Sequence, residues 1–172
     1  MAVGGRGSLS TDTASIGSPG AGPIGILHEG RVHRFASLRH RRTHTPVHRL
    51  DAVAPVFAPA LGEGPELLEA IGPLMDGPVV MGVGGGHIPT SMVAALCELA
   101  ERAPVVLAGR PHHMSLSRTY RSAGSEGDLL GRGLLSAGAL SAWQSRILLL
   151  VGLACGYGRA DLAAALDDAG VP

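Results

Sequence analysis

The pattern of hydrophobic positions changes at about residue 51 of the chain. From there on, short apolar runs without alternating polar positions are separated by longer stretches with helical spacing. Apolar strands that alternate with helices are typical of a parallel sheet covered by helices on both faces. The pattern predicts strands at 52–59, 77–84 and 104–110 and helices at 64–75, 89–103, 128–133, 141–155 and 159–169. We therefore expect a small three-layer α/β domain over residues 51–172, with a turn after residue 133.

The first 50 residues follow a different pattern. Residues 1–23 are rich in Gly, Ser, Thr and Pro, which is typical of a loop or a poorly ordered terminus. Residues 23–35 carry apolar positions on both sides of Glu29-Gly30, a pattern that predicts a β-hairpin. The stretch that follows has few apolar side chains and contains Thr-Pro, so we interpret it as a linker. Because a two-stranded hairpin is marginally stable by itself, residues 1–50 look like a piece of something larger.

Composition limits the classes of partner. Hydrophobic residues make up 45% of the 172 residues and charged residues 16%, so the chain can bury a sizeable core. The formal net charge is zero, which gives no general attraction to nucleic acid or to an anionic membrane. The longest apolar run, from Ile147, is too short to cross a bilayer, and the N-terminus lacks the apolar core of a signal peptide. We expect a cytoplasmic protein without a membrane partner.

One basic segment departs from this balance. Between His28 and Arg49 the chain carries five histidines and six arginines against one acidic residue. A nucleic-acid-binding patch would explain such a segment. However, Phe35 is its one aromatic residue, and the sequence predicts no recognition helix there. We interpret the segment as a solvated linker and expect no nucleic-acid partner.

The sequence gives little support for a metal or a cofactor. His44 and His48 are four residues apart, but Pro46 between them argues against a helical pair of metal ligands. Cys97 and Cys155 are isolated in apolar stretches, which is typical of buried thiols that act as small hydrophobic side chains. All 14 basic residues are arginine, so this chain has no lysine for Schiff-base, P-loop or lysine-dependent catalysis. Arginine is no substitute, because it stays charged at any working pH.

The stretch VVMGVGGGHIPTSM, residues 79–92, is the strongest local motif. Gly82 and Gly84 could begin a dinucleotide-binding fingerprint, but its third position is His87, and no acidic residue follows where a ribose would need one. A flexible turn at the carboxyl end of a parallel strand is the simpler interpretation. Open α/β sheets bind ligands at that edge, and N–H groups at the start of a following helix suit a carboxylate.

Two long segments resemble a known family. GPVVMGVGGGHIPTSMVAALCELAERAPVVLAGR (77–110) and RTYRSAGSEGDLLGRGLLSAGALSAWQSRILLLVGLA (118–154) resemble the C-terminal domain of the bacterial-type L-asparaginases. SPGAGPIGILHEGRVHRF (18–35) resembles the hairpin that closes the N-terminal domain of that family. The resemblance implies that residues 1–50 are the end of an N-terminal domain with the interdomain linker, and that residues 51–172 are the C-terminal α/β domain. Members often carry Lys-Ala-Arg where this chain has Gln144-Ser145-Arg146, and we expect Arg146 to form a structural ion pair.

The resemblance implies an activity and also a problem for it. Family members hydrolyse the side-chain amide of asparagine, and often of glutamine, without a cofactor. Their threonine nucleophile lies in a Thr-Gly-Gly motif, and a second threonine, an aspartate and a lysine assist it. This chain has neither Thr-Gly-Gly nor lysine. Its STDT at Ser10–Thr13 echoes the second motif but lies too close to residue 18. We interpret that echo as chance similarity, the alternative being an internal deletion that joined the two motifs.

We therefore expect an asparaginase-family amidohydrolase that lacks its N-terminal catalytic domain and is inactive alone. A separate chain could supply that domain. The alternatives are a non-catalytic module for amino-acid binding or dimerisation, and a degenerate product without activity.

The resemblance also implies substrate-binding residues. In the family's dimers, the C-terminal domain lends such groups to the active site of a neighbouring subunit, so a homo-oligomer is expected. Glu126 stands where members carry a glutamate that meets the substrate α-amino group, and a carboxylate is a natural partner for ammonium. His87 stands where several members carry asparagine, and Gly86 precedes it. The simpler alternatives are a solvated loop acid for Glu126 and a helix N-terminal residue without a ligand for His87.

Overall fold

The computed structural model describes residues 7–8, 16–17, 23–35, 43–45, 47–60, 62–110 and 119–169. The chain divides into two compact units between Thr43 and His44. The first unit contains two antiparallel strand pairs, and the second contains a four-stranded sheet and the helices. That the first unit is the end of a larger N-terminal domain stays a prediction.

The first unit confirms the predicted hairpin. Strands β3 (Gly25–His28) and β4 (Arg31–Arg34) pair around Glu29 and Gly30, whose φ angles of 47° and 73° match the left-handed turn that tight hairpins prefer. Residues 1–23 are not all loop, because β1 (Gly7–Ser8) pairs with β2 (Ile16–Gly17). On the hairpin, the cross-strand partners Leu27 and Val32 are 72% and 71% exposed. The described contacts therefore bury little of its apolar surface.

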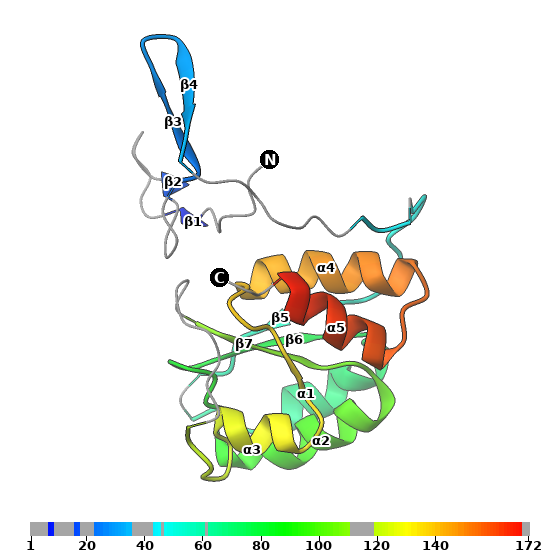
Figure 1. Ribbon diagram of the computed structural model, residues 1–172. Coiled ribbons are helices and arrows are strands. Elements are labelled where there is room, and N and C mark those ends of the chain that lie inside the picture. Colours follow the sequence, from blue (N-terminus) through cyan, green and yellow to red (C-terminus); the bar gives the residue numbers. More distant parts are fainter. Residues whose placement is uncertain are drawn as a thin grey trace. The chain divides into compact units, whose positions relative to one another are not determined.

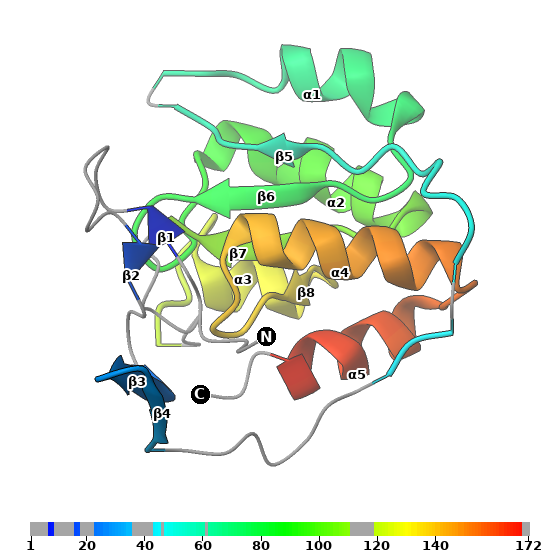
Figure 2. The ribbon, with the colours of Figure 1, turned by 90° about the horizontal axis from the view of Figure 1, so that it is seen from above.

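The second unit confirms the predicted three-layer α/β architecture (Figures 1 and 2). A parallel sheet with strand order β5-β6-β7-β8 forms its middle layer. The strands are β5 (Val56–Phe57), β6 (Val79–Gly82), β7 (Val106–Gly109) and β8 (Leu135–Ser136). One face is covered by α1 (Glu66–Ile71), α2 (Val93–Arg102) and α3 (Glu126–Gly131), and the other by α4 (Ala142–Ala154) and α5 (Arg159–Ala169). Short 3-10 turns at Gly72–Leu74 and Thr90–Met92 follow α1 and precede α2.

The two outer strands are where the sequence-based expectations differ most from the structure. Strand β5 is much shorter than the predicted 52–59, since Pro55 and Pro59 flank it and proline cannot donate to a ladder. Strand β8 lies in the region predicted as a turn. Only two of its residues pair with β7, and the N–H of Leu135 donates to the Val105 carbonyl. So short a strand is defined by its tertiary partner rather than by a local pattern.

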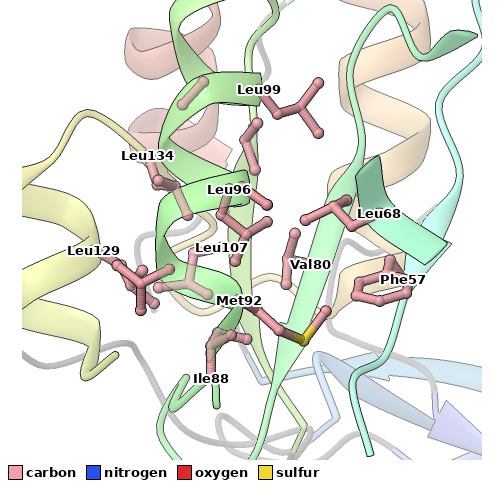
Figure 3. Packing of buried hydrophobic residues seen from close by; sticks show 14 of the residues in the cluster. Phe57, Leu68, Val80, Ile88, Met92, Leu96, Leu99, Leu107, Leu129 and Leu134 are labelled. Atoms are coloured by element: carbon pink, nitrogen blue, oxygen red, sulfur yellow. The ribbon is translucent and has the colours of Figure 1, made fainter. Parts of the chain in front are cut away.

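Neighbouring residues of the central strands enter opposite cores, which explains their uninterrupted apolar sequences. Val80 on β6 and its register partner Leu107 on β7 face α1, α2 and α3, whereas Val79 and Val106 face α4 and α5. Figure 3 shows the first of these clusters, with Phe57, Leu68, Val80, Ile88, Met92, Leu96, Leu99, Leu107, Leu129 and Leu134. Helices therefore bury both faces of the sheet. This packing holds the ends of β6 and β7, which carry the candidate site, in place.

Arginine side chains tie the helices to distant backbone. Arg146 on α4 donates from Nε to the Ala54 carbonyl at 2.7 Å, and no ion pair to it is found among the described residues. The expected ion pair is thus replaced by a hydrogen bond to the segment before β5. Arg159, the first residue of α5, donates to the carbonyls of Ala100 and Ala103 at the end of α2 and to that of Gly133. The last carbonyls of a helix have no acceptor role within it, so the bonds to Ala100 and Ala103 let Arg159 cap the end of α2 from another element. None of the helices in the described part of the chain is long and apolar enough to cross a membrane.

Candidate functional site

The candidate site lies at the carboxyl ends of β6 and β7. These strands are parallel and in register from Val79 and Val106 to Gly82 and Gly109, so the loops after them leave the sheet at one edge. Open α/β sheets bind ligands at this edge. The sequence placed the glycine motif there, and the structure confirms that location.

The glycine motif forms a closed turn rather than an open phosphate-binding loop. Val83 and His87 exchange two backbone hydrogen bonds of 2.8 and 2.9 Å, and positive φ angles at Gly84 and Gly86 allow the reversal. A Cβ at Gly82 would lie 2.4 Å from the carbonyl carbon of Gly86, so the turn folds tightly over the strand end. The N–H of Gly86 donates to the Val83 carbonyl at 3.1 Å. The turn therefore fixes the position of His87. The Gly86 N–H donates within the turn and is not directed at a ligand.

Glu126 is the first residue of α3 and is 1% exposed. The residue before it, Ser125, is the N-cap and accepts a hydrogen bond from the N–H of Asp128 at 3.4 Å. This local pattern explains why the helix starts here, because Ser is among the preferred N-caps. Glu126 is thus a buried carboxylate, and its interpretation as a solvated loop acid is wrong.

The structure brings Glu126 and His87 together. His87 Nδ1 lies 3.7 Å from Glu126 Oε2, and the side chains are 43% and 1% exposed, respectively. A half-exposed imidazole therefore stands beside a buried carboxylate at the sheet edge. This arrangement places a ring nitrogen that solvent can reach next to a buried carboxylate oxygen.

Tyr120 is a third member of this group and was not recognised in the sequence. Its N–H donates to Glu126 Oε1 at 3.3 Å, and its ring lies edge-on to that of His87, with centroids 5.3 Å apart and planes at 65°. The one available signal was an aromatic residue in a polar loop, in a chain with two Tyr, two Phe and one Trp. Because one of its contacts is made by the backbone, residue type alone could not reveal it.

A backbone hydrogen bond holds the two halves of the site in register. The N–H of Ile88, next to His87, donates to the carbonyl of Gly124 at 2.8 Å. Gly124 has a φ of 79°, and a Cβ there would lie 2.3 Å from the Ile88 carbonyl oxygen. The glycine turn and the start of α3 can approach this closely only because residue 124 has no side chain.

A cavity of about 580 Å³ opens beside His87. It is lined by Pro59, Ala60, Gly62, Val83, His87, Ile88, Pro89 and Arg110. Arg110 follows β7 and donates from Nη2 to the Pro59 carbonyl at 3.3 Å. Neither Glu126 nor Tyr120 lines this cavity, so His87 stands between it and the buried carboxylate.

The carboxylate of Asp128 stabilises the helix turn that carries Glu126. Its Oδ1 accepts from Arg132 Nε at 2.7 Å, and its Oδ2 accepts from the N–H of Gly124 at 3.0 Å. These contacts, that with Arg132 first, lower the pKa of Asp128 from its ordinary value of 3.8. The ionised form is therefore the one that favours folding. The contribution of Asp128 to the free energy of unfolding is complete at pH values above its ordinary pKa. It is lost as the pH falls through the lowered pKa of the folded protein.

We expect Asp128→Asn to lower the melting temperature by a few degrees at neutral pH, and this difference to shrink below about pH 4. Thermal unfolding followed by circular dichroism from about pH 3 to pH 7 measures it. Asp167→Asn, at an exposed position of α5, is the matched control and should show no such trend. The two proteins could instead differ by the same melting temperature over this whole pH range. That result would contradict the claim that the ionised form of Asp128 stabilises the fold.

Known proteins are similar to this chain in sequence. Residues 58–166 match the family described as the Glutaminase/Asparaginase C-terminal domain. The chain is 33% identical over 145 residues to a probable L-asparaginase of Deinococcus radiodurans, and the match covers 82% of this chain and 44% of that protein. It is 29% identical over 136 residues to an L-asparaginase of Bacillus licheniformis, with 78% of this chain and 42% of that protein covered.

A solved structure is similar in fold. The thermostable L-asparaginase from Thermococcus kodakarensis superposes with a TM-score of 0.82 at 20% identity, over 95% of this chain and 51% of that one. The chain therefore spans about half the length of the relatives that it matches.

Proposed function

Because the chain belongs to the glutaminase/asparaginase family through its C-terminal domain, we propose that it supplies the amino-acid-binding part of an asparaginase-type amidohydrolase. The reaction is hydrolysis of asparagine to aspartate and ammonia. The observation that carries this proposal is the buried Glu126 carboxylate, 3.7 Å from His87 at the carboxyl edge of the sheet. A small zwitterionic substrate needs such a fixed anion for its ammonium group.

Each site residue has its own part in this proposal. Glu126 accepts hydrogen bonds from the substrate α-ammonium, and its burial strengthens that interaction because the surroundings screen it little. His87, which is 43% exposed, supplies a second hydrogen-bonding group next to the buried carboxylate. Gly86 shapes the turn that places His87, since its own N–H is bonded to Val83. No cofactor is required for this recognition.

The chemical step needs groups from outside these 172 residues. A hydroxyl nucleophile must be activated by a base at neutral pH, and family resemblance assigns that work to threonine, aspartate and lysine of an N-terminal domain. The chain carries no lysine and no Thr-Gly-Gly motif. Thr11 and Asp12, which echo the second motif, lie outside the described residues. We therefore propose that a separate chain with an N-terminal domain completes the site. A homo-oligomer of this chain adds none of the missing groups, so this chain alone binds the amino acid without hydrolysing its amide.

Glu126→Gln tests the proposal, since it keeps the shape of the side chain and removes its charge. We expect the affinity for L-aspartate to fall about ten- to hundredfold, as for the loss of one hydrogen bond between charged groups. Titration of the 172-residue chain followed by heteronuclear NMR measures the dissociation constants. Glu98→Gln, an exposed carboxylate on α2, is the control and should bind as the unchanged chain does.

The same samples, given L-asparagine, should release no ammonia above background. Equal affinities for Glu126→Gln and the unchanged chain would contradict the binding role. Ammonia release that disappears in Glu126→Gln would contradict the need for another domain. Binding without hydrolysis, even after an N-terminal asparaginase domain is added, would indicate a non-catalytic binding module instead.

A further inference from the structure

Tyr120 contacts both members of the candidate site, and we infer that it is a positioning residue that holds His87 against Glu126. Its ring meets the imidazole edge-on, with centroids 5.3 Å apart and planes inclined at 65°. Aromatic rings attract one another in this geometry at centroid separations of about 4.5–7 Å. The consequence for ligand binding rests on the proposed function, whereas the positioning of the imidazole does not.

The backbone of Tyr120 is fixed independently of its ring. Its carbonyl accepts a hydrogen bond from Ser125 Oγ at 3.0 Å, and its N–H donates to Glu126 Oε1 at 3.3 Å. Ser125 and Glu126 are 0% and 1% exposed, so both partners belong to the buried start of α3. A change of the Tyr120 side chain therefore leaves these two bonds available. The ring can therefore be replaced while the two hydrogen bonds that hold the Tyr120 backbone are kept.

His87 needs such a support. Its backbone is held by the closed turn with Val83, but its side chain is 43% exposed and also lines the cavity that contains Arg110. An imidazole at this boundary has two directions available, toward Glu126 or into the cavity. The edge-on ring of Tyr120 favours the first, in which Nδ1 stays near Glu126 Oε2. Tyr120 thus positions the His87 imidazole, which is the second group that would hydrogen-bond near a bound ammonium.

The positioning is tested first without any ligand. In the unchanged chain, nuclear Overhauser contacts should join the ring protons of Tyr120 to those of His87. Tyr120→Leu removes the aromatic ring, so the imidazole resonances of His87 should lose their ring-current shift. The populations of the two tautomers, with the proton on Nδ1 or on Nε2, should also change. Tyr120→Phe keeps the ring and should preserve both. Absence of the contacts in the unchanged chain, or His87 resonances that do not move in Tyr120→Leu, would overturn the inference.

Binding tests whether Tyr120 acts through His87. We expect Tyr120→Leu to weaken L-aspartate binding about two- to tenfold, the range for the loss of one aromatic pair, and Tyr120→Phe to restore it. In a His87→Ala background, Tyr120→Leu should have no further effect. An equal loss in both backgrounds would show that Tyr120 acts independently of His87 and would overturn the inference. If the unchanged chain binds no aspartate, the proposed function fails, and the His87 resonances still decide the positioning role.

Discussion

Gly124→Ala should lower the free energy of unfolding by about 3 kcal/mol, which combines a strained left-handed residue with overpacking. The φ of 79° already disfavours a side chain. The added Cβ would also lie 2.3 Å from the Ile88 carbonyl oxygen, which is a backbone atom and cannot swing away. The hydrogen bond from Ile88 to Gly124 would stretch, and His87 would move relative to Glu126. Urea unfolding followed by circular dichroism measures the loss, and weaker L-aspartate binding should accompany it.

Two other glycines of the same region separate the causes. Gly133 has a φ of 98° with nothing within 4 Å of an added Cβ, so Gly133→Ala carries the conformational cost alone. Gly131 lies in α3, also with open space around it, so alanine there should be neutral or slightly stabilising. We expect destabilisation in the order Gly124→Ala, Gly133→Ala, Gly131→Ala. Equal effects at Gly124 and Gly133 would mean that the close approach to Ile88 contributes nothing.

Leu107→Ala should destabilise the second unit by about 2–5 kcal/mol, the range for truncating a buried leucine in a tightly packed core. Leu107 lies in the centre of β7 beside Val80 and is 0% exposed. Helices α2 and α3 pack over its cluster, so truncation would leave a cavity inside a buried core (Figure 3). Urea unfolding measured by circular dichroism reports this change, because the described helices all belong to the second unit.

Leu74→Ala is the matched control for this truncation. It removes the same atoms from a side chain that is 71% exposed, and its effect should be small. Similar losses for the two variants would mean that burial in the cluster is not what makes Leu107 important.

The sequence predicts the interior of this fold better than its margins. Apolar runs such as Val79 to Gly82 identify central strands, because residues that are buried on both faces need no polar alternation. The helix over 141–155 was predicted within one residue at each end, and its Ser141–Gln144 capping box explains the start. The two-residue strand β8 was missed, since its pairing depends on a neighbour that local spacing does not encode.

The candidate site shows the same division between local and non-local information. The position of the glycine turn follows from a strand, a glycine cluster and Pro89, which are all local signals. Family resemblance implied that Glu126 and His87 both bind substrate, but their nearness was not predicted, because 39 positions of chain separate them and no pattern links them. The contacts of Tyr120 use one backbone N–H and one ring edge, and neither can be inferred from residue type.

The capping of α2 by Arg159 has a consequence for the order in which the protein acquires its structure. During synthesis, β5, β6, α2 and β7 all leave the ribosome before residue 159 has been joined to the chain. The carbonyls of Ala100 and Ala103 must then be satisfied by water until α5 docks. The early part of the sheet can pair while its outer helix is still absent, but the end of α2 is completed only after α5 has been made. The end of α2 therefore reaches its native hydrogen bonding only once α5 has docked.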